Sequence, residues 1–274
     1  MSFKAALVQM RSGIALEKNA SDAERLIREA AALGAGYVLT PEVTNIFEPD
    51  KDRLRSLVRN EADDPCVQMA GRLSRELNIH LHLGSVAVRA DDGRIANRSL
   101  LFRPDGTIAA RYDKIHLFDI DLPSGESYRE SATYAPGAEA VAVTLPFATL
   151  GFAICYDMRF PRLANSLASA GATVLAYPSA FTVPTGQAHW HVLLRARAIE
   201  TGSFVLAAAQ GGMHEGGKAT YGHSLIINPW GEILAEAGTE PCVIAADIDV
   251  AASAAARGRI PALKNARDFT LKRL

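Results

Sequence analysis

The chain has 274 residues, of which 49% are hydrophobic and 22% are charged, and its formal net charge is −1. This composition predicts one large domain over residues 1–274, and the near-neutral charge gives no electrostatic reason to bind nucleic acid or an acidic membrane. Three cysteines, Cys66, Cys155 and Cys242, are too few and too widely spaced for a disulfide framework, so we expect a reducing, cytoplasmic environment.

The N-terminal half alternates strand and helix patterns. Phe3–Met10 predicts a strand, without the basic and apolar regions of a signal peptide before it. A helical period over Leu16–Leu33 ends at Gly34, and the apolar run Gly36–Leu39 predicts the next strand. The other elements expected here are a helix over Cys66–Leu77 and strands over Ile79–Val88, Asn97–Arg103 and Thr107–Tyr112. Turn signals between the last three strands predict an antiparallel meander.

The C-terminal half has the same mixture of strand and helix patterns. We expect a strand over Thr149–Cys155, helices over Pro161–Ala170 and Gln187–Thr201, and strands over Ala172–Tyr177, Phe204–Ala209, Ser224–Asn228, Glu232–Glu236 and Cys242–Asp249. The glycine-rich stretch Gly211–Gly217 predicts a mobile loop. Nothing in the chain approaches the roughly 20 consecutive apolar residues that cross a bilayer. Two mixed sheets, each covered by helices, account for this order of elements.

Three reactive side chains lie at the ends of three expected strands. Cys155 stands where an apolar strand gives way to a turn, Glu42 follows the run Gly36–Leu39, and Lys114 follows Thr107–Tyr112. Backbone N–H groups at a strand-to-helix junction favour a thiolate. A cysteine in an apolar run is more often a buried structural residue, and a glutamate or lysine at a strand end is more often a solvated rim residue. The combination of the three favours a catalytic site.

These segments, in this order, resemble the nitrilase superfamily of carbon–nitrogen hydrolases. The resemblance extends over nearly the whole chain, through the blocks Tyr177–Phe181, Thr185–Trp190, Leu193–Thr201, Tyr221–Ser224 and Pro229–Gly231. It implies a four-layer α-β-β-α sandwich of the α/β class, a homodimer or higher homo-oligomer, and a Glu-Lys-Cys triad that corresponds to Glu42, Lys114 and Cys155.

The chemistry of amide hydrolysis assigns a role to each member of this triad. An amide requires a strong nucleophile, a stabilised oxyanion and a proton for the departing nitrogen. We expect Cys155 to attack, Glu42 to move the protons, and the Lys114 ammonium to stabilise the oxyanion together with the backbone N–H of Tyr156. A thioester intermediate follows from this assignment.

Three further residues are candidates for the site. The resemblance implies a second glutamate after the lysine, and we assign Glu130, with Glu126 as the alternative and as the more probable exposed loop acid. Ala180 and Phe181 follow an expected strand end and are predicted, with Tyr156, to contact the substrate. His80 and His82 share a strand face without a third ligand at metal-binding spacing, so we expect no metal and no other cofactor.

The substrate is expected to be a small amide, hydrolysed with water. The blocks Thr185–Trp190 and Ala207–Gln210 resemble the deaminated glutathione amidases, which repair a metabolite, and the ω-amidases that act on α-ketoglutaramate resemble the chain almost as well. We expect deaminated glutathione to be preferred, because Gly211–Gly217 would make room for its longer leaving group. A nitrilase, an N-carbamoyl amino acid hydrolase and a catalytically silent interaction protein remain alternatives.

Overall fold

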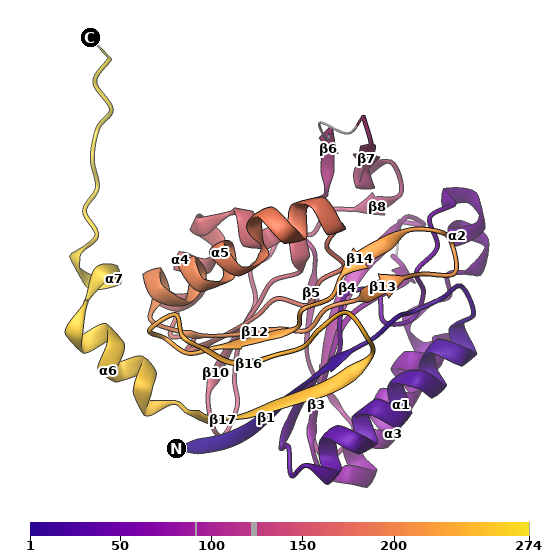
Figure 1. The fold of residues 1–274 in the computed structure, drawn as a ribbon, viewed down its shortest axis with the longest axis horizontal. Helices are drawn as coiled ribbons and strands as arrows, with labels where there is room; N and C mark the ends of the chain where they lie inside the picture. Colours follow the sequence, from indigo (N-terminus) through magenta and orange to yellow (C-terminus); the bar gives the residue numbers. More distant parts are fainter. Residues whose placement is uncertain (91, 122–124, 274) are drawn as a thin grey trace.

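Two β-sheets lie face to face, and a layer of helices covers the outer face of each (Figure 1). The computed structural model describes residues 1–90, 92–121 and 125–273. This arrangement confirms the expected α-β-β-α sandwich. The catalytic candidates come from both sheets, so the way the sheets meet decides the geometry of the site.

The first sheet carries the segments that lead to Glu42 and Lys114. Its order is β17 (Cys242–Asp249), β1 (Ser2–Gln9), β2 (Tyr37–Leu39), β3 (His80–Arg89), β4 (Ile95–Phe102) and β5 (Ile108–Asp113), and β8 (Tyr134–Ala135) pairs with β4. Strands β1, β2 and β3 are mutually parallel, whereas β3, β4 and β5 form the antiparallel meander that the turn signals predict.

The second sheet carries the segment that leads to Cys155. Its order is β16 (Ile233–Glu236), β15 (Leu225–Ile227), β12 (Phe204–Ala207), β11 (Val174–Ala176), β10 (Thr149–Phe152) and β9 (Ala142–Thr144). Strands β10, β11 and β12 are parallel. Two hairpins stand outside the sheets: β6 (Asp119–Asp121) with β7 (Ser127–Arg129), and β13 (Gly211–Met213) with β14 (Ala219–Tyr221).

Helices form the two outer layers. α1 (Leu16–Ala32) and α3 (Pro65–Leu77) pack on the first sheet, and α4 (Pro161–Ser169) and α5 (Val183–Thr201) pack on the second (Figure 1). Shorter helices are α2 (Lys51–Leu57), α6 (Ala251–Arg259) and α7 (Ala262–Asn265), with 3₁₀ turns at Glu61–Asp63, Glu130–Ala132 and Cys155–Arg159. Among the described residues, every helix is too short or too polar to span a bilayer.

Alternate side chains of β1 belong to two different hydrophobic cores, one between the sheets and one between the first sheet and its helices. Ala5 and Leu7 point between the sheets, whereas Ala6 and Val8 point toward α1 and α3, and all four side chains are fully buried. Successive side chains of a strand face opposite sides, and a sheet covered on both faces requires apolar residues at every position. The strand therefore reads as a continuous apolar run.

Two expectations about the second half of the chain are wrong in detail. Helix α5 begins at Val183, four residues before the expected Gln187, because Thr182 starts the helix and Pro184 is tolerated in the first turn. Gly186 fits inside this turn since a Cβ there would stand 2.2 Å from the Tyr221 ring of β14. The glycine-rich stretch, expected to be a loop throughout, forms strand β13 and most of the turn that leads to β14.

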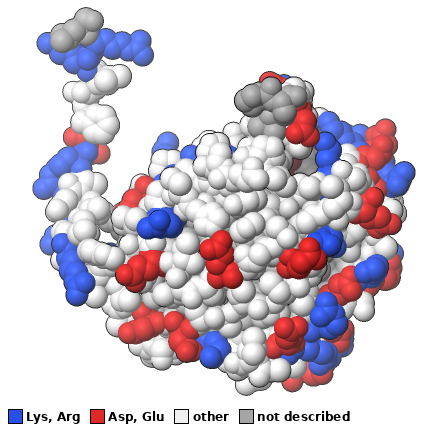
Figure 2. Space-filling view, viewed as in Figure 1, with Lys and Arg blue, Asp and Glu red and all other residues white. Residues whose placement is uncertain are grey.

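The sequence analysis also missed elements that border the site. Helix α2 and the β6–β7 hairpin lie in polar segments without a clear apolar period. Acidic and basic side chains are intermixed on the visible face of the body, and basic ones gather on the C-terminal segment (Figure 2). That segment runs away from the rest of the molecule after α7 (Figure 1).

Candidate active site

The structure brings Glu42, Lys114 and Cys155 together although they follow three different strands. Glu42 lies three residues after β2, Lys114 directly after β5, and Cys155 three residues after β10. All three side chains are almost completely buried. The first sheet thus supplies the carboxylate and the amine, and the second supplies the thiol.

The Lys114 ammonium sits between two carboxylates. Its Nζ donates to Glu42 Oε1 at 2.8 Å and to both oxygens of Glu130 at 3.0 Å. Burial alone would lower the pKa of Lys114, but the charges of Glu130 and Glu42 outweigh it and hold that pKa well above its ordinary value. Lys114 is therefore a permanent cation at neutral pH, as an electrostatic role requires.

Cys155 occupies a constrained turn. Its φ is +48°, a region that residues with a Cβ rarely adopt, and its N–H donates to the Pro178 carbonyl at 2.9 Å. Burial raises the pKa of its thiol well above the ordinary value, and the charge of Glu42 raises it further, whereas Lys114 and the Ala180 N–H act in the opposite direction. The thiol is protonated at rest, so attack requires a base.

Glu42 is positioned to be that base. Its Oε2 accepts the Ala180 N–H at 2.8 Å, and its Oε1 accepts hydrogen bonds from Lys114 and from Asn97 Nδ2, the latter at 2.9 Å. Gln210 fixes the backbone at the same position, since its Nε2 donates to the Glu42 carbonyl at 3.0 Å. Three separate segments therefore hold the carboxylate, and a fourth holds the backbone of the same residue.

The two candidate loop glutamates have different surroundings. Besides binding Lys114, Glu130 accepts the Phe118 N–H at 2.6 Å, and its side chain is only 13% exposed. Glu126 is 42% exposed and pairs with Lys218 at 3.2 Å, away from the triad. The geometry thus groups Glu130, not Glu126, with Glu42, Lys114 and Cys155, which we call the floor.

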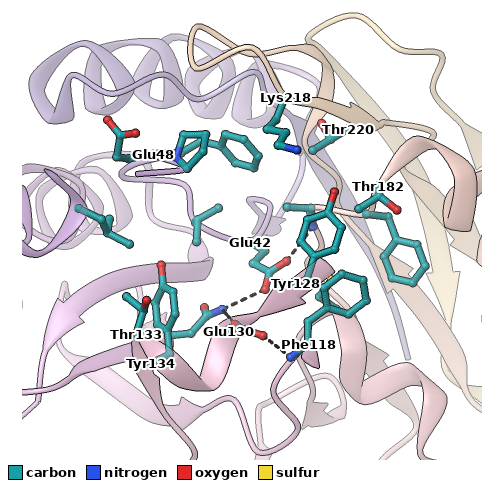
Figure 3. Close-up of a pocket in the computed structure, with 18 of the residues that line it drawn as sticks. Glu42, Glu48, Phe118, Tyr128, Glu130, Thr133, Tyr134, Thr182, Lys218 and Thr220 are labelled. Carbon is teal, nitrogen blue, oxygen red and sulfur yellow. Dashed lines mark hydrogen bonds between the residues drawn. The ribbon is translucent and has the colours of Figure 1, made fainter. Parts of the chain in front are cut away.

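The floor closes one end of a cavity of about 390 Å³ (Figure 3). Ala180 and Phe181 line the cavity as expected. Tyr156 is not among its lining residues, and its ring instead packs against Phe118 and Phe160. The expected contribution of Tyr156 is its backbone N–H, which belongs to the first turn of the 3₁₀ segment Cys155–Arg159, where N–H groups lack a helical acceptor.

Two polar residues of the site were missed. The Asn97 amide bridges the carboxylates, with Nδ2 at 2.9 Å from Glu42 and 3.4 Å from Glu130, while its buried Oδ1 has no partner among the described residues. Asp157 is completely buried and accepts from the Ile154 N–H at 2.8 Å, which holds the turn of the thiol. An asparagine inside an expected strand is a usable signal, because strands are depleted in it.

The walls of the cavity come from elements that the sequence analysis did not anticipate. Tyr128 of β7 and Lys218 and Thr220 of the β13–β14 hairpin lie across the cavity from Glu130 (Figure 3). We call Tyr128, Lys218 and Thr220, with the adjacent Glu126, the rim. Within the described ranges, no group of three or more histidine, cysteine, aspartate or glutamate side chains is arranged to hold a metal ion.

The arrangement brings a buried thiol, a buried carboxylate and a buried ammonium together at one cavity. A thiol beside a carboxylate and an ammonium can attack a carbonyl carbon, transfer the proton and stabilise the oxyanion. The cavity falls in the size range of pockets that enclose small organic ligands.

Comparisons with known proteins agree with this chemistry. The model of the carbon–nitrogen hydrolase family matches residues 4–258. The human omega-amidase NIT2 is 38% identical over 97% of this chain and 95% of its own length, and the bovine deaminated glutathione amidase is 38% identical over 96% of this chain and 81% of its own.

The fold has close counterparts among solved structures. The crystal structure of the Caenorhabditis elegans NitFhit protein superimposes with a TM-score of 0.90 and is 35% identical over 97% of this chain. The chain spans 65% of the length of that protein.

Proposed function

This chain belongs to the carbon–nitrogen hydrolase family, and is an amidase of the nitrilase superfamily; from that premise we propose that it hydrolyses deaminated glutathione. The observation that carries the proposal is the floor: a buried thiol, a buried ammonium and two carboxylates at the closed end of a cavity. We propose that Glu42, Lys114, Glu130 and Cys155 do the chemistry, and that the residues 1–274 act as one domain.

Acylation begins with proton transfer from Cys155 to Glu42. Because burial raises the pKa of the thiol, the thiolate forms only as the sulfur attacks the amide carbonyl carbon and the carboxylate takes the proton. Lys114 and the Tyr156 N–H stabilise the oxyanion of the tetrahedral intermediate. The C–N bond then breaks, Glu42 returns the proton to the departing nitrogen, and a thioester remains.

Deacylation reverses the same proton path. Glu42 takes a proton from a water molecule, whose oxygen attacks the thioester carbon. The C–S bond breaks, the proton returns to the sulfur, and the carboxylic acid leaves. Glu130 and the Ala180 N–H hold Lys114 and Glu42 in place through both steps, while Phe181 provides an apolar wall.

The substrate assignment rests on the leaving-group side of the cavity. Deaminated glutathione and α-ketoglutaramate deliver the same 2-oxo acyl group, but the former releases a dipeptide and the latter ammonia. A cavity of about 390 Å³, bordered by the β13–β14 hairpin, has room for the longer leaving group. An ω-amidase is the second candidate, since NIT2 matches over nearly its full length.

Measured kcat/KM values for both amides test this assignment. We expect deaminated glutathione to be hydrolysed faster than α-ketoglutaramate at equal low concentration, with an N-carbamoyl amino acid and a simple nitrile as control substrates. A preference for α-ketoglutaramate would make the protein an ω-amidase, and turnover of only a control substrate would overturn both candidates.

The cellular setting belongs to the same proposal. A catalytic thiol requires a reducing environment, and all three cysteines are unpaired, so we propose that the enzyme works in the cytoplasm. The oligomeric state is a separate part of the proposal. The family resemblance implies a homodimer. Light scattering that gives the mass of a monomer would contradict the proposed homodimer.

A further inference from the structure

Four basic side chains line the cavity, and two of them are already fully engaged. Lys114 is held by Glu42 and Glu130. Arg129 binds both oxygens of Asp121, at 2.8 and 3.0 Å, and also donates to two backbone carbonyls. The remaining cations are Lys51, at the start of α2, and Lys218, on the hairpin. Among the described cationic side chains of the cavity, these two are the ones available to pair with a substrate anion.

Lys218 already has a carboxylate beside it. Its Nζ donates to Glu126 Oε1 at 3.2 Å and lies 5.7 Å from the centre of the Tyr128 ring. The Tyr128 hydroxyl reaches the same carboxylate oxygen at 3.4 Å. At the rim, an ammonium and a phenol hydroxyl thus both contact one carboxylate.

The ion pair between Lys218 and Glu126 can be replaced by an ion pair between Lys218 and another carboxylate. The side chains of Lys218 and Glu126 are 50% and 42% exposed, and ion pairs in such surroundings contribute little net stability. A carboxylate of the substrate can replace Glu126 at small cost, because the lysine remains paired throughout. The buried pairs of the floor do not have this property.

Buried contacts of His214 hold the hairpin that carries Lys218. His214 contacts the Ser12 carbonyl at 2.8 Å and Thr220 Oγ1 at 2.7 Å, and its ring stacks on Phe47 with 3.9 Å between centroids. Both Phe47 and Thr220 line the cavity. Lys218 lies in the turn directly before β14, so the buried contacts of His214 and Thr220 hold the backbone on either side of it, while its side chain stays half exposed.

The order of the two half-reactions orients the substrate. The acyl group stays bound to Cys155 while the leaving group departs and water enters, so the leaving group must face the open rim. We infer that Lys218 binds a carboxylate carried by the leaving group of the substrate, with Glu126 holding the lysine in the empty enzyme. This inference rests on the proposed function and specifies the substrate class: 2-oxo γ-amides with an anionic, peptide-like leaving group.

The test compares deaminated glutathione with the same compound capped as a C-terminal carboxamide. The capped form keeps the scissile bond and the size of the leaving group but removes its charge. We expect wild type to prefer the free carboxylate by about tenfold in kcat/KM, as for one charge-assisted contact at a partly exposed site. Lys218→Ala should abolish that preference, and Lys218→Arg should retain most of it.

Two variants serve as controls. Lys51→Ala removes the other available cation from the same cavity and should keep the wild-type preference. Glu126→Gln removes the competing carboxylate and should lower KM for the free form more than for the capped form.

The outcomes separate this inference from the proposed function. If wild type hydrolyses both compounds without preference, or if Lys218→Ala keeps the preference, the role of Lys218 is wrong while the amidase assignment stands. An equal loss in Lys51→Ala would likewise exclude a specific role for Lys218. If wild type hydrolyses neither compound, the proposed substrate itself fails, and the inference fails with it.

Discussion

The floor and the rim each contain a glutamate–lysine pair of nearly the same length, yet the two pairs differ in burial. Glu130 and Lys114 are 3.0 Å apart and 13% and 2% exposed, whereas Glu126 and Lys218 are 3.2 Å apart and 42% and 50% exposed. Breaking a buried pair leaves an uncompensated charge that costs about 3–5 kcal/mol, while an exposed pair is worth about 0–1 kcal/mol. Burial, not distance, separates fixed machinery from an adjustable contact.

Removing the nucleophile is the most severe way to break the floor. We expect Cys155→Ala to lower kcat by at least about 10⁴-fold, because no other group of the floor can form the thioester. The fold should persist, since only one atom is lost from a side chain at a strand end; circular dichroism checks this. Continued release of ammonia or dipeptide would contradict covalent catalysis by Cys155.

Neutralising the base should stop both half-reactions. Glu42→Gln keeps the shape of the side chain but cannot take the thiol proton, so kcat should fall by about 10²–10⁴-fold. Mass spectrometry of the variant mixed with substrate should find no acyl-enzyme. An accumulated thioester would mean that Glu42 is needed for deacylation alone.

The same substitution at the two loop glutamates tests the comparison directly. Glu130→Gln removes a charge from the buried cluster, and a cost of about 2–5 kcal/mol corresponds to at least a roughly thirtyfold loss of kcat/KM. Glu126→Gln should retain most activity on α-ketoglutaramate, whose leaving group carries no charge. Equal losses in the two variants would refute the distinction between floor and rim.

Substitution of Asn97 should have a smaller effect, which we expect in kcat rather than in KM. Asn97→Ala removes the donor that the two floor carboxylates share, so kcat should fall by about tenfold while KM changes little. Asn60→Ala is the control, because the Asn60 amide binds Asp63 on the exposed surface. A change confined to KM would mean that Asn97 contacts substrate instead of positioning Glu42 and Glu130.

The smallest effect is expected from chelation. The proposed mechanism has no step that uses a metal ion, so incubation with EDTA should leave kcat unchanged. The control is the same buffer without chelator. Loss of activity that added divalent metal restores would show that the mechanism lacks a component.

The sequence reveals the floor better than the rim. Glu42, Lys114 and Cys155 can be located because each follows a strand-like run and because the blocks around them resemble the nitrilase superfamily. Asn97 could not be assigned, since its contact with Glu42 spans 55 residues. The positive φ of Cys155 could not be predicted either, because residues with a Cβ rarely adopt that region.

The residues that form the walls of the cavity could not be predicted from the sequence for a related reason. The stretch Gly211–Gly217 has the composition of a loop, but Gly211–Met213 pairs with Ala219–Tyr221 in a hairpin, and His214 in its turn contacts Ser12 and Phe47. These partners lie far away in the chain. Local composition therefore predicts the position of the turn and not the surface it presents.

The division of the floor between two sheets has a consequence for how the enzyme acquires activity. Glu42 and Lys114 follow strands of one sheet and Cys155 a strand of the other, so neither half can become competent before the sheets dock. Pairing of distant segments is slow relative to local helix formation. During refolding, recovery of turnover should therefore lag behind recovery of the helical circular dichroism signal. Turnover then measures the docking of the two sheets, which is a late step of folding.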